Sequence, residues 1–215
     1  LARVLIKIVE TVDRTGKREE TMGLENTFFA IVTRMKFISR WSVMRNSYTQ
    51  NDSEHSMEVA MIAHALAIIG NKRLGRDYHP ERIAVMGLYH DFTEIITGDL
   101  PTPVKYRNDK IKSAFKEIEE EAAQELLERL PEDLRGEYAP YLQESEWTPE
   151  EYKLVKAADK LSALIKCIEE QKAGNQEFQK AKEASEAYLR DMNCPEADIF
   201  CQEFLPHYYK TLDEL

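Results

Sequence analysis

The stretch LYHDFTEIITGDLPTP, residues 88–103, places an adjacent His and Asp inside an apolar helical pattern. Glu94 follows one turn later, and a turn rich in Gly and Pro then holds Asp99. Because the neighbouring positions are apolar, these polar groups lie where a helix is expected to face a protein interior. The question is why a protein would gather four ionisable side chains in so short a segment, namely those of His90, Asp91, Glu94 and Asp99.

Apolar residues at helical spacing predict that helices occupy most of the chain. The expected helices cover residues 24–39, 53–69, 80–90, 109–130, 149–172, 176–192 and 196–212, with loops at 39–52 and 98–103. Asp52 or Ser53 is expected to cap the second helix. Gly70 and Gly75 are expected to end it, and Pro80 suits the first turn of the next helix. The predicted fold class is therefore all-α.

The length of 215 residues favours a single domain and is sufficient to bury a sizeable core. We assign residues 23–215 to one helical bundle. Residues 1–22 are interpreted as an N-terminal extension of uncertain origin, because Leu1 is not a natural start and Met22 is a candidate initiator.

The net charge of −10 argues against a nucleic-acid polymer as partner, since a phosphate backbone requires a basic surface. A small phosphorylated ligand needs only a local cation. No apolar run approaches the roughly 18 residues typical of a membrane span, so no membrane partner is expected. The three cysteines are odd in number and lack a CxxC pair. With no recognisable signal peptide, the expected location is the cytoplasm.

His90 and Asp91 are consecutive helical positions, about 100° apart, so that both side chains can reach one ion. The face of His90 also carries Ile83 and Gly87, which indicates that the imidazole points inward. Gly87 leaves space one turn before His90, either for a ligand or for the close approach of another helix.

His55 and Asp159 also lie beside apolar helical stripes. A buried carboxylate without a partner costs several kcal/mol or more, on the order of magnitude expected for desolvated charges. One divalent ion would satisfy both residues together with the His-Asp pair. A set of two imidazoles and two carboxylates suits Mn, Fe, Co or Zn and can leave positions open for water and substrate.

Ordinary structural roles compete with this interpretation. A single His at a helix start is more often a core or capping residue than a ligand, and one His-Asp dipeptide occurs by chance. Asp159 alone has possible ion-pair partners in Lys156 and Lys160 on a solvated face. His64 and His207 are assigned to packing or to the surface, and the cysteines to packing.

The order SEHS, YHD and KAADKL resembles the HD-domain metal-dependent phosphohydrolase superfamily, which is named for its His-Asp pair. The longer segments ISRWSVMRN, SEHSMEVAMIAHAL, YHDFTEIITGDLPTPVKY and VKAADKLSALIKCIEE are similar to the bacterial 5′-deoxynucleotidases of that superfamily. The resemblance covers about residues 23–213. It implies a single HD-domain helical bundle that splits deoxynucleoside 5′-monophosphates into deoxynucleoside and phosphate.

The resemblance also implies site residues. The matching metal ligands are His55, His90, Asp91 and Asp159. The matching substrate contacts are Arg40, Trp41, Asp91, Asp99, Leu100, Pro101 and Thr102. Those expected to take part in catalysis are Glu94, Arg40 and Asp91. The implied cofactor is a divalent ion, with Co, Mn, Zn and Cu as candidates, and the implied assembly is a homodimer.

The residue types permit a mechanism in which an ion-activated water attacks phosphorus. The planar fork of Arg40 suits two phosphate oxygens, although a surface ion pair is its ordinary alternative. Glu94 is expected to contact the attacking water or the neighbours of a metal ligand. Its ordinary alternative is a solvated position at a helix end. Asp99 is expected to bind the sugar or to protonate the leaving oxygen. Trp41 is expected either to exclude a ribose hydroxyl or simply to anchor the core.

Three functions therefore compete. The first is a metal-dependent 5′-deoxynucleotidase, and the second is an HD-domain hydrolase of another small phosphoester or a cyclic nucleotide. The third is a regulatory HD module that binds nucleotide without turnover. The third is disfavoured because all four candidate ligands are present. The missing Gly-rich phosphate loop argues against nucleoside-triphosphate chemistry of the P-loop kind.

Overall fold

The computed structural model describes residues 26–105 and 107–215, and helices build the domain. The α-helices are α1 Phe28–Val32, α2 Asp52–Arg73, α3 Pro80–Tyr89, α4 Glu94–Thr97, α5 Thr102–Lys105, α6 Asp109–Glu128, α7 Glu132–Leu142, α8 Pro149–Lys172, α9 Gln179–Asp191 and α10 Pro195–Glu203. Within the described residues, β pairing is limited to an isolated antiparallel bridge between Ser39 and Asn51. The all-α prediction is confirmed. The proposed extension, residues 1–22, lies outside the described residues.

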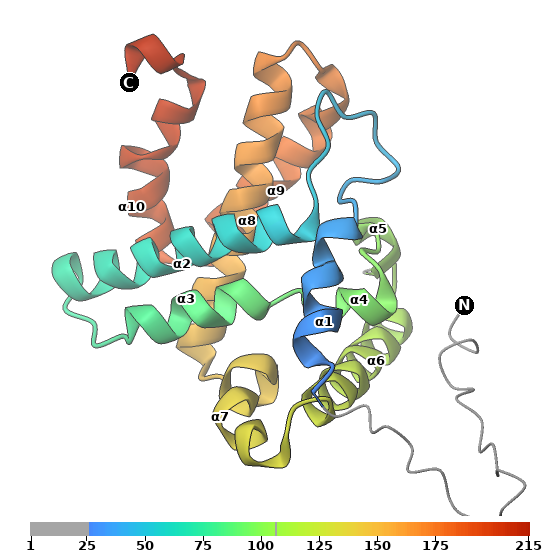
Figure 1. Ribbon diagram of the computed structural model, residues 1–215. Helices are drawn as coiled ribbons and strands as arrows, with labels where there is room; N and C mark the ends of the chain where they lie inside the picture. The colour runs from blue at the N-terminus through green and yellow to red at the C-terminus, as the bar shows by residue number, and fades with distance from the viewer. Residues whose placement is uncertain (1–25, 106) are drawn as a thin grey trace, which may run out of the picture.

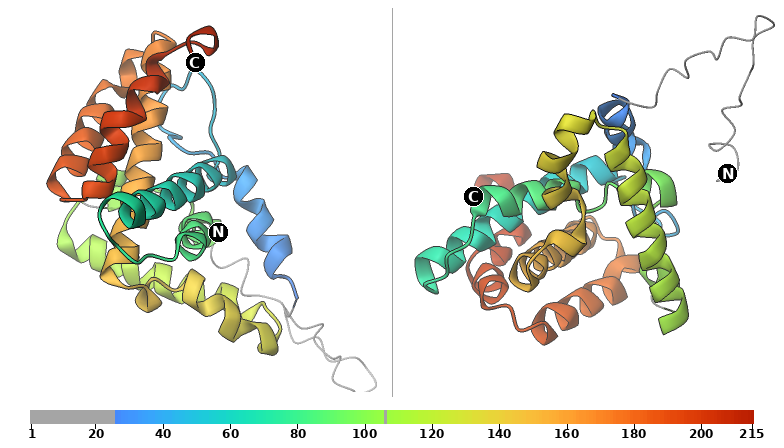
Figure 2. Two further views of the ribbon diagram at one scale, coloured as in Figure 1. Left: turned by 90° about the vertical axis from the view of Figure 1, so that its left-hand side faces the viewer. Right: turned by 90° about the horizontal axis from the view of Figure 1, so that it is seen from below.

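The long helices α2 and α8 organise the domain (Figures 1 and 2). Helix α2 packs along α3 and crosses α8, and α8 in turn packs against α9. The larger core lies among these helices and includes Val59, Leu66 and Leu161, all fully buried. A second core, around Phe28 and Phe92, joins α1 to α6 and α7. Two of the helices that carry predicted ligands, α2 and α8, thus line the larger core.

Gly87 lets α2 and α3 approach each other closely. A Cβ atom at this position would lie 3.1 Å from the Cα atom of Ala60 and 3.3 Å from the carbonyl oxygen of Val59. Both are backbone atoms, so a larger side chain would separate the helices. Of the two roles predicted for Gly87, the structure supports the close approach of another helix. That contact fixes the position of His90, which follows α3.

The predicted boundaries of α2 need correction. Its N-cap is Asn51, whose side chain accepts a hydrogen bond from the backbone N–H of Glu54. The Glu54 side chain in turn accepts one from the backbone N–H of Asn51. This capping box leaves Asp52 free to point inward. The helix also continues through Gly70 to Arg73, because Gly70 accommodates the ring of Tyr78, which lies 2.5 Å from where its Cβ would be.

Other departures from the predicted elements have local causes. The single helix expected at 24–39 is instead the short α1 followed by a 3₁₀ helix, Thr33–Phe37. Helix α7 lies in a stretch for which no helix is predicted, and it accommodates Gly136 and Pro140, two residues that disfavour a helix interior. Helix α5 lies partly in the expected 98–103 loop. Pro80 does occupy the first turn of α3, as predicted.

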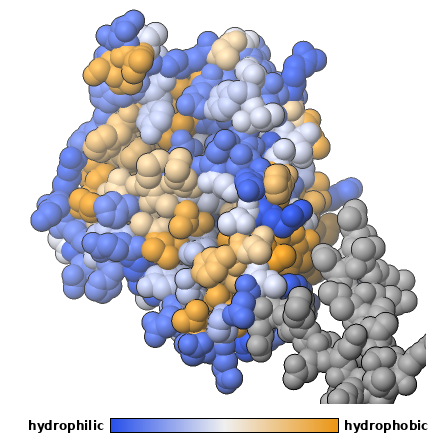
Figure 3. Space-filling model, in the orientation of Figure 1, coloured by the Kyte–Doolittle hydropathy of each residue, from blue (hydrophilic) through white to orange (hydrophobic). Residues whose placement is uncertain are grey.

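The surface shows hydrophobic patches separated by hydrophilic residues on the face that includes α1, α2 and α3 (Figure 3). Exposed apolar side chains of α1 and α2 include Phe29, Met57 and Met61. In the part of the chain that the structure describes, no helix combines the length and the apolar character needed to cross a membrane.

Candidate active site

Three helical elements bring the four predicted ligands together. His55 lies in the first turn of α2, His90 and Asp91 directly follow α3, and Asp159 lies inside α8. Nε2 of His55 lies 3.3 Å from Oδ1 of Asp159 and 3.5 Å from Oδ2 of Asp91. The same Asp91 oxygen lies 3.1 Å from Nε2 of His90. Three potential ligand atoms, one each from His55, His90 and Asp159, all lie within 4.8 Å of one another.

The two imidazoles present a bare nitrogen to the site. Nδ1 of His90 donates to the backbone carbonyl of Gly87 over 2.8 Å, and Nδ1 of His55 lies 2.9 Å from the hydroxyl oxygen of Ser162. Both Nε2 atoms are buried and have no hydrogen-bond partner. Buried polar atoms are normally satisfied, so two unpaired nitrogens that face carboxylates fit a divalent cation.

The protonation states of His55 and of the two carboxylates also fit a cation. For His90, burial would lower the pKa, but the adjacent Asp91 raises it above its usual value. Burial, followed by the Arg40 guanidinium, lowers the pKa of His55 to about 4, so this imidazole is neutral at pH 7. Burial alone would raise the pKa of Asp91, but His90 and Arg40 hold it well below its usual range. Burial likewise opposes ionisation of Asp159, but Lys160 and His55 keep its pKa low. A neutral imidazole and ionised carboxylates are the forms that bind metals.

Asp159 combines the two roles considered from sequence. Its Oδ2 atom lies 3.1 Å from Nζ of Lys160, which is one of the ion pairs expected from ordinary surface chemistry. Its side chain is nevertheless only 10% exposed, and Oδ1 faces His55. The carboxylate is therefore not on a solvated face, and one oxygen remains directed into the site.

Arg40 enters the site from the loop before α2. Its Nη1 atom donates to Oδ2 of Asp91 over 3.0 Å and to Oδ1 of Asp52 over 3.2 Å. The antiparallel bridge between Ser39 and Asn51 holds this loop against the start of α2. Burial would lower the pKa of Arg40, but Asp91 and other nearby carboxylates raise it above its usual range. The guanidinium is therefore a permanent positive charge beside the predicted ligands.

Asp52 was missed as a site residue, because its sequence position suggested only a helix cap. It is fully buried, and its Oδ2 atom has no hydrogen-bond partner. Burial raises its pKa to about 6, opposed by Arg40. Ligand atoms of Asp52, Asp91 and Glu94 form a second close group. The signal that was available is an Asp one turn before His55, on the same side of the helix.

Glu94 is buried rather than solvated. Its Oε1 atom accepts a hydrogen bond of 2.8 Å from Nζ of Lys105, whereas its Oε2 atom is buried without a partner. Burial and the nearby Asp91 carboxylate raise the pKa of Glu94 to about 9, although Lys105 opposes this shift. Only 3% of Glu94 is exposed, which removes the alternative of a solvated helix end.

The loop after α4 approaches the loop that carries Arg40. Gly98 has a φ of +74°, which suits glycine and turns the chain toward Asp99. The backbone amide of Trp41 donates a hydrogen bond to the Asp99 carboxylate. Burial raises the pKa of this carboxylate. The predicted contacts continue through the partly buried Leu100 and Pro101 to Thr102, which begins α5.

Trp41 has an unusual backbone and a packed ring. Its φ of +56° is rare for a bulky residue and indicates local strain. The indole packs on the buried ring of Phe178, with centroids 5.2 Å apart, and its Nε1 atom is buried without a hydrogen-bond partner. This packing is consistent with a core anchor. Trp41 also directly follows Arg40 in the chain, so the predicted role in excluding a ribose hydroxyl stays open as well.

The remaining candidates are placed as predicted. His207 is exposed and His64 is half-buried, and neither belongs to the close His and carboxylate groups of the described residues. Cys167 and Cys194 are buried, and Cys201 is partly buried, all as free thiols.

The comparison with protein families finds one match over nearly the whole chain. The model described as "5′-deoxynucleotidase YfbR-like" matches residues 27–208. Among curated proteins, the 5′-deoxynucleotidase of Cronobacter sakazakii is 48% identical over 191 residues, which is 89% of this chain and 96% of that protein. The 5′-deoxynucleotidase YfbR of Escherichia coli has the same identity over the same shares of both chains.

Solved structures share the fold. An HD-domain phosphohydrolase from Listeria innocua aligns with a TM-score of 0.74 and 23% identity, covering 85% of this chain and 88% of that one. The cyanophage S-2L HD phosphohydrolase, solved with dA and one catalytic Zn²⁺ ion, aligns with a TM-score of 0.62 and 22% identity. That alignment covers 85% of this chain and 96% of the phage protein. These likenesses support the HD-domain fold.

Proposed function

Because this chain belongs to the YfbR-like 5′-deoxynucleotidase family and is a metal-dependent phosphoric monoester hydrolase, we propose that its active site is the cluster around His55, His90, Asp91 and Asp159. The observation that carries the assignment is the pair of buried Nε2 atoms, of His55 and His90, that face carboxylates without a hydrogen bond. The substrate is a deoxynucleoside 5′-monophosphate, and the products are deoxynucleoside and phosphate.

The ion held by this nitrogen and oxygen set would supply Lewis acidity, which lowers the pKa of water and offsets charge on a phosphate oxygen. The mixed ligand set suits Co, Mn or Zn, with Cu as a further candidate. In the reaction, a water oxygen bonds to phosphorus as the bond from phosphorus to the 5′ oxygen breaks.

Arg40 is proposed to bind the phosphate. Both of its hydrogen bonds to carboxylates use Nη1, so Nη2 remains for a phosphate oxygen. Its side chain is 12% exposed, and Asp52 and Asp91 hold it in place. Charge-assisted hydrogen bonds of this kind are stronger than neutral ones, and arginine suits the geometry of phosphate better than lysine does.

Glu94 is proposed to contact the attacking water, or the neighbours of a metal ligand, and to take part in proton transfer there. Its unpartnered Oε2 atom is available, while Lys105 fixes Oε1. Asp99 is proposed to contact the deoxyribose or to protonate the leaving 5′ oxygen. The neighbouring Trp41 is proposed to pack near C2′ of the sugar, where an apolar surface would disfavour a ribose hydroxyl. Leu100, Pro101 and Thr102 complete the proposed substrate contacts.

The proposed assembly is a homodimer, and the proposed location is the cytoplasm. The C-terminal segment supports the first proposal because Phe204 and Tyr209 are 41% and 48% exposed. Free thiols at Cys167, Cys194 and Cys201 support the second, since reducing compartments keep cysteines unpaired. Light scattering coupled to size-exclusion chromatography would test the dimer.

Phosphate release from a panel of monophosphates tests the function. The panel pairs each deoxynucleoside 5′-monophosphate with the matching ribonucleotide and with the matching 3′-monophosphate. Each substrate is assayed before and after chelation of the protein's metal, and again after addition of Co²⁺, Mn²⁺, Zn²⁺ or Cu²⁺. We expect turnover of the deoxynucleoside 5′-monophosphates, lost on chelation and regained with one of these ions. Turnover that prefers another phosphoester, or that is indifferent to chelation, would contradict the assignment.

A further inference from the structure

We infer that Glu58 and Ser162 are positioning residues that hold His55 in the tautomer with a bare Nε2. The inference rests on the proposed ligand role of His55. Nδ1 of His55 lies 2.9 Å from the Ser162 hydroxyl oxygen, and that hydroxyl donates a hydrogen bond to the carboxylate of Glu58. Three side chains from α2 and α8 thus form one chain of hydrogen bonds that ends at the metal site.

The direction of this chain follows from the donors available. An ionised carboxylate accepts hydrogen bonds and cannot donate them, so the single hydroxyl proton of Ser162 is directed to Glu58. The Ser162 oxygen must then accept from His55, which places the imidazole proton on Nδ1. Ser162 is fully buried and His55 is 1% exposed, so water does not compete for the bond between them, whereas Glu58 is only partly buried.

His90 reaches the same state by a simpler route. Its Nδ1 atom donates to the carbonyl oxygen of Gly87, a backbone group that can only accept. A hydroxyl accepts or donates with equal ease, so Ser162 alone would leave the tautomer of His55 undetermined. Glu58 removes that ambiguity. A carboxylate in this position also makes the ligating nitrogen more basic, and substitution of such outer residues typically weakens metal affinity by about 10–100-fold.

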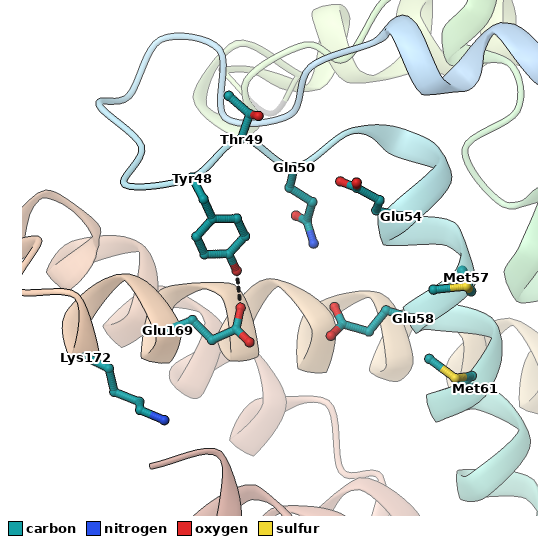
Figure 4. A pocket seen from close by; sticks show the side chains of 9 residues that line it. All are labelled: Tyr48, Thr49, Gln50, Glu54, Met57, Glu58, Met61, Glu169 and Lys172. Atoms are coloured by element: carbon teal, nitrogen blue, oxygen red, sulfur yellow. Dashed lines mark hydrogen bonds between the residues drawn. The ribbon is translucent and has the colours of Figure 1, made fainter. Parts of the chain in front are cut away.

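Glu58 can be changed without opening the core, because it lines a surface pocket of about 540 Å³ (Figure 4). Glu169 from α8 lines the same pocket and bonds to Tyr48. Figure 4 shows both side chains among those that line the pocket. The hydrogen bond of Glu169 joins it to Tyr48 and not to Ser162 or His55, so its removal is a control for the loss of one negative charge at this pocket.

The test compares Glu58→Ala, Glu58→Gln, Ser162→Ala and Glu169→Ala with the wild type. The first readout is a long-range ¹⁵N–¹H spectrum of the histidines in chelated protein, which reports the tautomer directly. The second is the dissociation constant for Mn²⁺ or Zn²⁺, and the third is the thermal unfolding of the metal-free protein. The Gln amide oxygen can still accept from Ser162, so Glu58→Gln serves as the conservative rescue.

We expect the Nδ1–H tautomer for His55 in the wild type and a mixture of tautomers in Glu58→Ala and Ser162→Ala. Metal affinity should fall about 10–100-fold in both variants, stay near wild type in Glu58→Gln, and not change in Glu169→Ala. Should Ser162→Ala fail to fold, the Glu58 variants decide. A wild-type Nε2–H tautomer, or unchanged affinity in Glu58→Ala, would overturn the inference. If His55→Ala itself retains the ion, the ligand assignment fails instead.

Discussion

Arg40 and Asp91 are 51 residues apart in the chain, yet Nη1 of Arg40 lies 3.0 Å from Oδ2 of Asp91. The same oxygen lies 3.1 Å from Nε2 of His90 and 3.5 Å from Nε2 of His55. A single carboxylate therefore joins the proposed phosphate-binding cation to the proposed metal ligands. Substrate phosphate and metal would meet at this point, which is what attack of an activated water on phosphorus requires.

Arg40→Lys should weaken binding of the monophosphate. A lysine keeps the charge but loses the fork, and one charge-assisted hydrogen bond contributes about 1.5–3 kcal/mol. We expect kcat/KM to fall about 10–100-fold, with metal content unchanged. Arg45→Lys is the control, because Arg45 is exposed in the same loop. An equal loss in both variants would attribute the effect to the loop rather than to phosphate binding.

Glu94→Gln should slow the chemical step while sparing metal and substrate binding. Loss of a positioned proton-transfer group typically lowers the rate by about 10²–10⁴-fold. Steady-state kinetics should show this loss in kcat with little change in KM. Glu119→Gln removes the other carboxylate near Lys105, at 3.5 Å, and should have a small effect. Loss of metal from Glu94→Gln would instead identify Glu94 as a ligand.

The loop before α2 depends on a buried ion pair. Lys166 and Glu170 are both fully buried on α8 and bond to each other, and Glu170 also accepts from the backbone N–H of Ser47 over 2.9 Å. Burial would raise the pKa of Glu170, but these partners lower it from 4.5 to about 2. That difference corresponds to about 3 kcal/mol of stability at neutral pH.

The sign of this effect gives a stability prediction. Because the folded pKa of Glu170 lies below the unfolded value, its contribution is complete above pH 4.5 and is lost as pH falls toward 2. Glu170→Gln should lower the free energy of unfolding by about 3–5 kcal/mol at pH 7, since it leaves the buried Lys166 charge without its counter-ion. Denaturant titrations should show this difference shrinking as the pH approaches 2.

An exposed pair with the same spacing provides the control. Lys116 and Glu120 are 66% and 61% exposed and lie 3.9 Å apart on α6. Glu120→Gln should change the free energy of unfolding by less than about 1 kcal/mol at any pH. A similar result for Glu170→Gln would show that the buried pair does not stabilise the loop.

Trp41→Ala separates the two roles of the indole. If the ring excludes a ribose hydroxyl, the ratio of deoxyribonucleotide to ribonucleotide turnover should fall, within the roughly 10²-fold range that apolar pockets achieve. Phe178→Leu removes the aromatic ring that packs against the indole. This control should lower the melting temperature without lowering the ratio of deoxyribonucleotide to ribonucleotide turnover. Equal losses of both substrates in Trp41→Ala would leave Trp41 as a core anchor and move discrimination to the loop at 99–102.

The sequence was informative where the chemistry is local. His90 and Asp91 are adjacent, and His55 and Asp159 lie on apolar stripes, so burial of all four could be predicted. Asp52 could not be distinguished from a helix cap, because the capping by Asn51 depends on backbone geometry. The roles of other polar residues depend on how α2 crosses α8, which no local pattern contains. They include Glu58 on α2 and Ser162 on α8, which share a hydrogen bond across the two helices.

The central claim is that one divalent ion is bound by residues from three separate segments, and metal analysis of purified single variants tests it most directly. The variants to compare are His55→Ala, His90→Ala, Asp91→Ala, Asp159→Ala and Glu94→Gln, each after confirmation of folding by circular dichroism. We predict about one ion per chain in the wild type and in Glu94→Gln, and a large loss in the other four, in line with ligand removal. Full metal content in a folded His55→Ala or Asp159→Ala protein would contradict the account.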